Sequence, residues 1–463
     1  MSARHADQQV NPFLDAPIGR LLLSNALPMA VVMSMGGVLN VVDGIFVGHF
    51  IGSDALAAVS LAFPVAMVLS ALTTLAGGGM SSLMARYLGA GDRAAAGRVF
   101  AGAHGLVLAI SVGLVALWLV IGPALVGSMA AGNPRVAGLA QDYLWIIILG
   151  APAQLLLGIH ADALRNEGRA SLIAALSVLV NLFNIGANWL GIVVLGLGIS
   201  GSALGTVAAQ ALGLALVVGV RGRNRELLPL SVLRSQSWLS AWSQIIRLGM
   251  PLCLSFIGIA LVASIVMLSL RFSAGTEYDT LIAAYGVVTR LLGFAFMPQM
   301  AIALAMQSIA GNNAGAGRND RARAALRLAM AAAFVWCLAV VLVGVFAGAT
   351  LGHWFSDDPA VIVAVAEILR PVMLFYAASG PVLVLALYFQ TLGQPGRTAA
   401  LTLVKPWLLT PFFILVLSVG FGVSGIWLAF PMADAIILML AVLMGRNVLH
   451  TADMQDVNAE KRR

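Results

Sequence analysis

One acidic side chain inside a long apolar segment is the first candidate for chemistry. Asp43 lies near the end of an apolar run that begins at about residue 21. In a membrane-spanning helix, a carboxylate costs about 2.5–3.5 kcal/mol on insertion scales and therefore needs a partner, a proton or a bound ion. Acids in such places commonly belong to proton or ion pathways. The alternative is a structural hydrogen bond near the membrane surface.

Three more polar residues occur at a similar depth in later apolar runs. Asn184 and Asn188 are four residues apart and so share one face of a helix, and Thr206 lies in the next run. With Asp43 they form a candidate ion-coupling site, whose oxygen atoms are also suitable ligands for Na⁺. The alternative is a hydrogen-bond network that packs the helices together.

Three of the charged residues within apolar runs of the second half are candidates for a functional role. Arg290, Lys405 and Asp434 line a cavity, take part in coupling, with Asp434 as a proton carrier, or neutralise one another, and Asp434 is a candidate partner for either base. Met297 and Met300 offer flexible side chains for a cavity wall that accepts varied ligands. We expect no metal centre apart from the Na⁺ possibility.

A proline precedes Asp43 by fifteen residues in the same run. Pro28 removes a backbone donor and can kink its helix. We therefore predict a hinge: protonation of Asp43 changes its bonds to neighbouring helices, and the helix bends near Pro28. A static kink is the alternative.

The composition requires a membrane protein. Of 463 residues, 60% are hydrophobic and 10% are charged, and the mean hydropathy is +0.97. Twelve helices of about 22 residues need about 264 positions, which this apolar content supplies. These values exclude soluble, disordered and nucleic-acid-binding classes. The expected spans are residues 21–47, 55–83, 99–121, 138–160, 171–194, 198–220, 245–270, 280–309, 324–350, 361–390, 398–420 and 422–445.

The distribution of arginine and lysine indicates the orientation. Most of them lie at the termini and in every second loop, and such basic loops face the cytoplasm. We expect a multi-pass protein of a bacterial inner membrane with both termini in the cytoplasm.

Short motifs recur at a nearly constant offset. Residues 89–91 match 315–317, residues 164–169 match 392–397, and residues 198–201 match 422–425. The repeat predicts an all-α architecture of two six-helix lobes, related by a pseudo-two-fold axis along the membrane normal, with a cavity between them. Its expected parts are an N-terminal lobe (1–220), a cytoplasmic linker (221–244) and a C-terminal lobe with a short tail (245–463). This architecture is typical of secondary transporters that work by alternating access.

Several of these stretches resemble the MATE (multidrug and toxic compound extrusion) family, most closely its DinF-like branch. They are DGIFVGHFIGSDALAAVSLAFP (43–64), LMARYLGAGDRAAAGRV (83–99), LRNEGR (164–169), AAYGVVTRLLGFAFMP (283–298) and GNNAGAG (311–317). The resemblance implies a monomeric exporter of amphipathic, mostly cationic compounds, driven by inward flow of H⁺ or Na⁺. It also implies that the acid in the first stretch, Asp43, is the ion-coupling residue.

One departure from the family affects the coupling ion. Archaeal members carry an Asn, an acid four residues later and a Thr eighteen further on, and here Asn184, Asn188 and Thr206 have that spacing with Asn188 in place of the acid. A single proton on Asp43 is therefore the first expectation, and Na⁺ stays open.

Two other functions compete with drug export. A flippase for lipid-linked oligosaccharide or another anionic lipid-linked substrate would use basic groups such as Arg290 and Lys405. An enzyme is not expected, because paired catalytic carboxylates, a nucleophile beside a histidine and a phosphate-binding loop are all missing from the sequence. We expect no cofactor and no nucleic-acid partner; the partners are small organic cations and the lipid bilayer.

Overall fold

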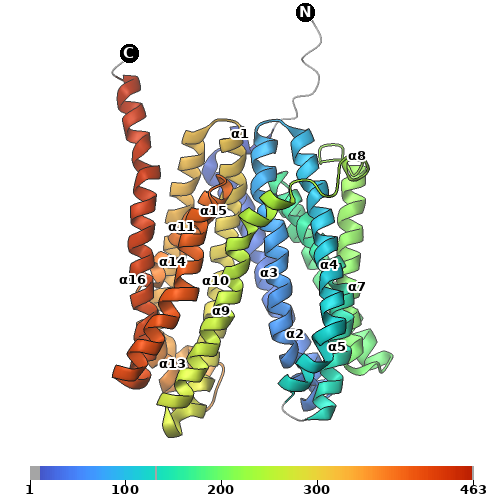
Figure 1. Ribbon diagram of the computed structural model, residues 1–463, viewed down its shortest axis with the longest axis vertical. Helices are drawn as coiled ribbons and strands as arrows, with labels where there is room; N and C mark the ends of the chain where they lie inside the picture. Colours follow the sequence, from blue (N-terminus) through green and yellow to red (C-terminus); the bar gives the residue numbers. More distant parts are fainter. Residues whose placement is uncertain (1–10, 131–132, 461–463) are drawn as a thin grey trace, which may run out of the picture. The chain divides into compact units, whose positions relative to one another are not determined.

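The computed structural model describes residues 11–130 and 133–460, and every regular element among them is helical (Figure 1). The long helices are α2 (Ile18–Phe50), α3 (Ser53–Gly89), α4 (Arg93–Met129), α5 (Pro134–Asn166), α6 (Ala170–Trp189), α7 (Gly198–Arg223), α9 (Trp242–Ser273), α10 (Tyr278–Gly315), α11 (Asn319–Phe346), α13 (Pro359–Val372), α14 (Tyr376–Thr391), α15 (Pro395–Val404) and α16 (Thr410–Glu460). Short helices are α1 (Pro12–Asp15), α8 (Val232–Ser235), α12 (Gly348–His353) and the 3₁₀ turn η2 (Gly275–Glu277). Two π-helical turns are η1 (Leu190–Val194) and η3 (Lys405–Leu409).

The helices form two compact units. The first contains residues 1–249 and 311–317, and the second contains residues 250–310 and 318–463. In the first unit, α5 packs against α3, α4 and α7, while α6 packs against α2 and α7. In the second unit, α11 packs against α14, and α14 packs against α15.

The helices account for the expected membrane spans. Ten stretches are long and apolar enough to cross a membrane, and α13 with α14 forms one further, bent span. The last of the ten, residues 395–446, contains two expected spans, because its helix is interrupted by non-helical backbone at Gly422. The expectation of one continuous helix over 361–390 is wrong: α13 and α14 meet at an angle of 54°. Pro371 lies in the last turn of α13, where it removes a backbone donor just before the break.

The internal repeat is also present in the backbone conformation. Gly91 and Gly317 both have a φ of +75°, and Gly198 and Gly422 have φ values of +58° and +59°. Residues with a side chain rarely adopt positive φ, which explains why glycine recurs at these helix ends. The matching motifs therefore build matching turns in the two halves.

One expected match is displaced by three residues. The sequence pairs Gly168 with Gly396, but the turn with the conformation of Gly168 (φ +78°) is at Gly393 (φ +76°). In each turn the next backbone N–H donates to a carbonyl five residues earlier, Arg169 to Leu164 and Gln394 to Phe389, both at 2.9 Å. This hydrogen bond is typical of a Schellman motif at the end of a helix. The structural equivalent of Gly168 is therefore Gly393, and not Gly396 as the sequence motif suggests.

Each unit has its own core. In the first unit, Met80, Phe100 and Leu155 are fully buried between α3, α4 and α5. In the second, Val266 and Val365 are fully buried and pack in one cluster with Trp427.

Candidate functional site

Three helices of the first unit bring the predicted coupling residues into one hydrogen-bonded chain. Asp43 is on α2, Asn184 and Asn188 are on α6, and Thr206 is on α7. Asn188 Nδ2 donates to Asp43 Oδ1 at 2.7 Å and also lies 3.3 Å from Asn184 Oδ1. Asn184 Nδ2 donates to Thr206 Oγ1 at 3.3 Å, and Thr206 Oγ1 donates to the Ser202 carbonyl at 3.1 Å. All four predicted residues are therefore connected.

The packing around Asn188 is very close. Asn184 and Asn188 are buried, and Asp43 and Thr206 are half-buried. A Cβ atom at Gly205 of α7 would lie 2.1 Å from Asn188 Oδ1, so only glycine permits this approach of α7 to α6. The turn that follows Asn188 is the π-helical turn η1, and such turns are frequent at functional sites.

The direction of the hydrogen bonds decides what the site can bind as it stands. The amide of Asn188 presents a hydrogen, and not its oxygen, to the Asp43 carboxylate. Asn188 Oδ1 is buried and has no hydrogen-bond partner in the described part of the chain. Asp43 therefore faces an amide hydrogen of Asn188 in this state, and a Na⁺ ion at Asp43 would need that amide turned to present its oxygen.

Two residues at this site were missed by sequence reasoning. Gly205 carries no chemistry, and only its contact with Asn188 reveals its importance. Tyr143 on α5 lies within electrostatic reach of Asp43, and its spacing in the sequence gives no signal of this.

The predicted hinge lies in an otherwise continuous helix. Pro28 is half-buried in α2, which runs unbroken from Ile18 to Phe50. One turn earlier, Ser24 Oγ and Asn25 Nδ2 both donate to the Leu21 carbonyl, at 3.2 and 2.8 Å. Because Pro28 has no N–H, the carbonyl of Ser24 loses its usual helical donor. Bending at this point stays a prediction.

Of the three charged residues predicted in the second unit, Lys405 and Asp434 form an ion pair and Arg290 lies apart from them. Lys405 Nζ donates to Asp434, so the partner suggested for Asp434 is Lys405 and not Arg290. Lys405 begins the second π-helical turn, η3. Arg290 is exposed on α10 and has no ion-pair partner among the described residues. Met300 is buried and Met297 is half-buried.

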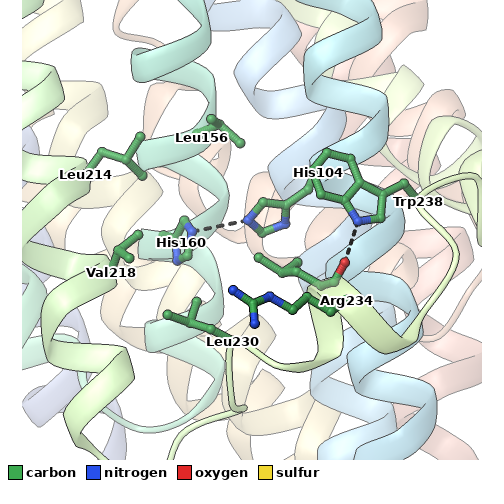
Figure 2. A pocket seen from close by; sticks show the side chains of 9 residues that line it. His104, Leu156, His160, Leu214, Val218, Leu230, Arg234 and Trp238 are labelled. Atoms are coloured by element: carbon green, nitrogen blue, oxygen red, sulfur yellow. Dashed lines mark hydrogen bonds between the residues drawn. The ribbon is translucent and has the colours of Figure 1, made fainter.

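Two histidines that the sequence suggests as packing residues lie beside each other. His104 on α4 and His160 on α5 are buried, and their Nε2 atoms are 3.2 Å apart. They line a cavity of about 410 Å³, shown in Figure 2, together with Arg234 and Trp238 of the linker. In the described chain, no third metal-ligating side chain joins them.

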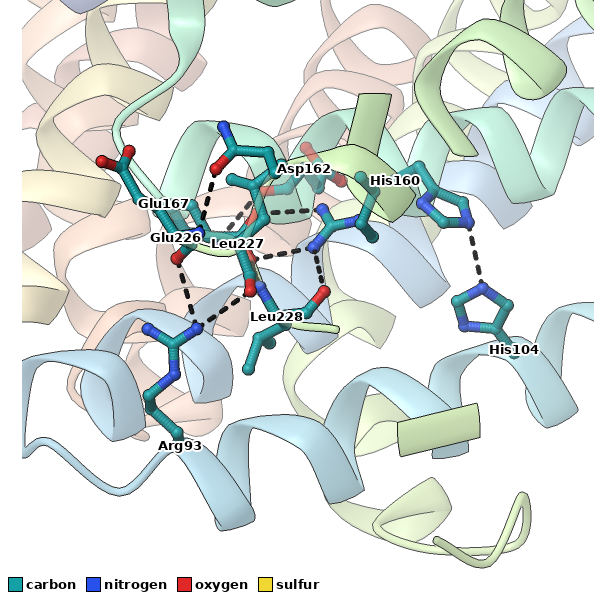
Figure 3. Close-up of polar contacts among 11 residues, drawn as sticks. Arg93, His104, His160, Asp162, Glu167, Glu226, Leu227 and Leu228 are labelled. Carbon is teal, nitrogen blue, oxygen red and sulfur yellow. Dashed lines mark hydrogen bonds and ion pairs between the residues drawn. The ribbon is translucent and has the colours of Figure 1, made fainter. Parts of the chain in front are cut away.

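Next to the histidines, a buried ion pair and several hydrogen bonds hold the beginning of the linker against α4 and α5 (Figure 3). Arg221 makes two parallel bonds to Glu167, both at 2.9 Å, and both side chains are almost completely buried. The backbone N–H of Leu228 also donates to Glu167 at 2.7 Å, and Arg93 donates to the Leu227 carbonyl at 2.9 Å. Arg93 and Arg221, which the sequence analysis counts among the basic residues of the cytoplasmic side, therefore also stabilise the fold.

Comparisons with known proteins agree with the motifs. The MatE family model matches residues 28–190 and 251–416. A FAD transporter of Shewanella oneidensis is 27% identical over 91% of this chain and 93% of its own length. The multidrug export protein MepA of Staphylococcus haemolyticus is 25% identical over 95% of both chains. The outward-facing structure of a multidrug resistance MATE transporter is 24% identical, covers 96% of this chain and 99% of its own, and has a TM-score of 0.86, which shows a common fold.

These relatives are transporters, as expected for a chain without enzymatic motifs. Because the family model matches both halves of the chain over most of their length, this protein belongs to the MatE family of multi-pass membrane transporters.

Proposed function

We propose that this protein exports amphipathic organic cations in exchange for protons, with Asp43 as the residue that carries the proton. The observation that supports this most is the single carboxylate of the polar chain on α2, α6 and α7, to which Asn188 offers an amide hydrogen. The names of the MepA relatives as multidrug export proteins support the substrate class.

The proposed coupling follows from the bonds of Asp43. In its charged form, the carboxylate accepts the hydrogen of Asn188 and so ties α2 to α6. Protonation removes the charge and weakens this charge-assisted bond, which is about twice as strong as a neutral one. At the same time the new O–H needs an acceptor. Asn188 Oδ1 has no hydrogen-bond partner among the described residues and can accept it when the amide turns. Exchange of these bonds gives α2 two arrangements, and bending near Pro28 would convert them into access from opposite sides of a bacterial inner membrane.

An anionic substrate is the second candidate. It is favoured by the similarity to a FAD transporter and by Arg290, which is exposed in a membrane span and has no ion-pair partner among the residues described. The flippase alternative also rests on basic groups, but the charge of Lys405 is compensated by Asp434. Arg290 is thus the main residue that supports an anionic cargo.

The test is transport into everted membrane vesicles that contain a single overproduced transporter. Wild type, Asp43→Asn and a control, Asp142→Asn, are compared under an imposed proton gradient and, separately, under a Na⁺ gradient. Asp142 is an exposed acid of α5 outside the polar chain. We expect proton-driven ethidium uptake by the wild type and the control, and its loss in Asp43→Asn.

Other outcomes separate the alternatives. Uptake driven only by Na⁺ contradicts proton coupling and keeps the family function. If FAD moves and ethidium does not, the substrate is anionic, and Arg290→Gln becomes the decisive variant. If neither moves under either gradient, the exporter proposal fails and the flippase is tested next with a lipid-linked substrate.

A further inference from the structure

The pocket beside His104 and His160 is apolar at one end and positively charged at the other. It lies within the first unit, between α4, α5, α7 and the linker (Figure 2). Leu156 is one turn before His160 on α5, and Leu214 is one turn before Val218 on α7. Those leucines lie away from the linker, on the side of the membrane interior. This end of the pocket is therefore apolar.

The other end carries a positive charge. Arg234 of α8 lines the pocket, and within the described chain its guanidinium has no ion pair or hydrogen bond. By contrast, the charge of Arg221 nearby is compensated by Glu167. Trp238 lies at the same end, and tryptophan is enriched where membrane meets water. The arginine distribution assigns this side to the cytoplasm, whose leaflet contains anionic lipids.

Between the two ends, the hydrogen bonds of the histidines leave one open acceptor. The Phe100 carbonyl can only accept, so His104 Nδ1, at 2.8 Å, must carry its hydrogen. In a neutral ring, His104 Nε2 is then an acceptor, and His160 Nε2 must donate to it across 3.2 Å. His160 Nδ1 therefore carries no hydrogen and is a hydrogen-bond acceptor. His160 is 2% exposed, and Nδ1 has no partner among the described residues.

An unsatisfied buried acceptor is costly, because it forfeits its hydrogen bonds to water. The natural occupant near His160 is therefore a group with an O–H or N–H donor. A metal ion between the two rings is a poor alternative, because no third ligand is present in the described chain.

We propose that this pocket binds an anionic phospholipid of the cytoplasmic leaflet whose headgroup carries hydroxyl groups, such as phosphatidylglycerol. The phosphate pairs with Arg234, a headgroup hydroxyl donates to His160 Nδ1, and one acyl chain lies between Leu156 and Leu214. The lipid thus connects the linker to α5 and α7. None of this involves Asp43, so the inference is independent of the proposed transport function.

The experiment is native mass spectrometry of the purified, delipidated full-length protein. Phosphatidylglycerol is compared with phosphatidylmethanol, which has the same charge and no hydroxyl, and with phosphatidylcholine, all with identical acyl chains. We expect binding in the order phosphatidylglycerol, phosphatidylmethanol, phosphatidylcholine. One hydrogen bond contributes about 0.5–1.5 kcal/mol. Phosphatidylglycerol should therefore bind about 2- to 10-fold more tightly than phosphatidylmethanol.

Variants connect each preference to one residue. Arg234→Gln should weaken phosphatidylglycerol binding about fivefold, from about 1 kcal/mol per basic residue near an anionic surface. Arg223→Gln, an exposed arginine outside the pocket, should leave it unchanged. His160→Phe should abolish the preference over phosphatidylmethanol and keep the preference over phosphatidylcholine. If His160→Phe does not fold, Leu214→Trp, which fills the apolar end, should weaken binding of all three lipids.

Three results would overturn the proposal. Equal effects of Arg234→Gln and Arg223→Gln would show that lipid binds elsewhere on the surface. An unchanged preference for phosphatidylglycerol in His160→Phe would exclude the hydroxyl contact. Equal binding of soluble glycerol 1-phosphate would show that the apolar end contributes nothing and that the site is not a lipid site.

Discussion

The contact between Gly205 and Asn188 allows the proposed coupling site to be disturbed without removing any of its polar residues. In Gly205→Ala, the new Cβ would lie 2.1 Å from Asn188 Oδ1, whereas ordinary contact begins at 3.4 Å, so the amide must move by about 1.3 Å. The bond from Asn188 Nδ2 to Asp43 is 2.7 Å long, and a displacement of that size breaks it. A hydrogen bond to a charged group contributes about 1.5–3 kcal/mol, which corresponds to about 10- to 150-fold. We therefore expect proton-driven uptake to fall at least about tenfold.

The control is an alanine where space exists. Gly186 is on α6, the helix that carries Asn188, and a Cβ there would meet no atom within 4 Å. Gly186→Ala should transport like the wild type, because it adds only the better helix propensity of alanine. The assay is initial ethidium uptake by everted vesicles at matched protein levels. Equal rates for Gly205→Ala and Gly186→Ala would refute the claim that the bond between Asn188 and Asp43 couples the proton.

The remaining predictions concern stability and the hinge. Arg221→Met leaves Glu167 charged and buried, and loss of one partner of such a pair costs about 3–5 kcal/mol, so the melting temperature should fall by several degrees; an unchanged value would show that the pair is dispensable. Pro28→Ala restores a helical donor and should keep or raise the melting temperature. Bending of α2 near Pro28 during transport predicts a lower transport rate for Pro28→Ala. A rate equal to that of the wild type would contradict the hinge and favour a static kink.

The sequence alone predicted four polar residues that the structure joins by hydrogen bonds. Asp43 was identified because acids are rare in apolar helices, and Asn184, Asn188 and Thr206 because they lie at a similar depth and match the spacing of the family that the chain resembles. Continuous apolar runs likewise predicted the spans, since a bilayer dictates their length. The repeated motifs predicted a duplicated architecture, and the structure shows that several of their glycines adopt the same positive φ, which favours glycine.

Tertiary structure decided which atoms meet. That Asn188 of α6 contacts Asp43 of α2 depends on how these two helices are rotated against each other. The pairing of Lys405 with Asp434, and of Arg221 with Glu167, joins residues 29 and 54 positions apart. Hydropathy and charge spacing describe a residue's depth and side of the membrane, and carry no information on which neighbouring helix its side chain will face. That choice is made by packing, and at the coupling site it places the oxygen of Asn188 against a glycine of α7.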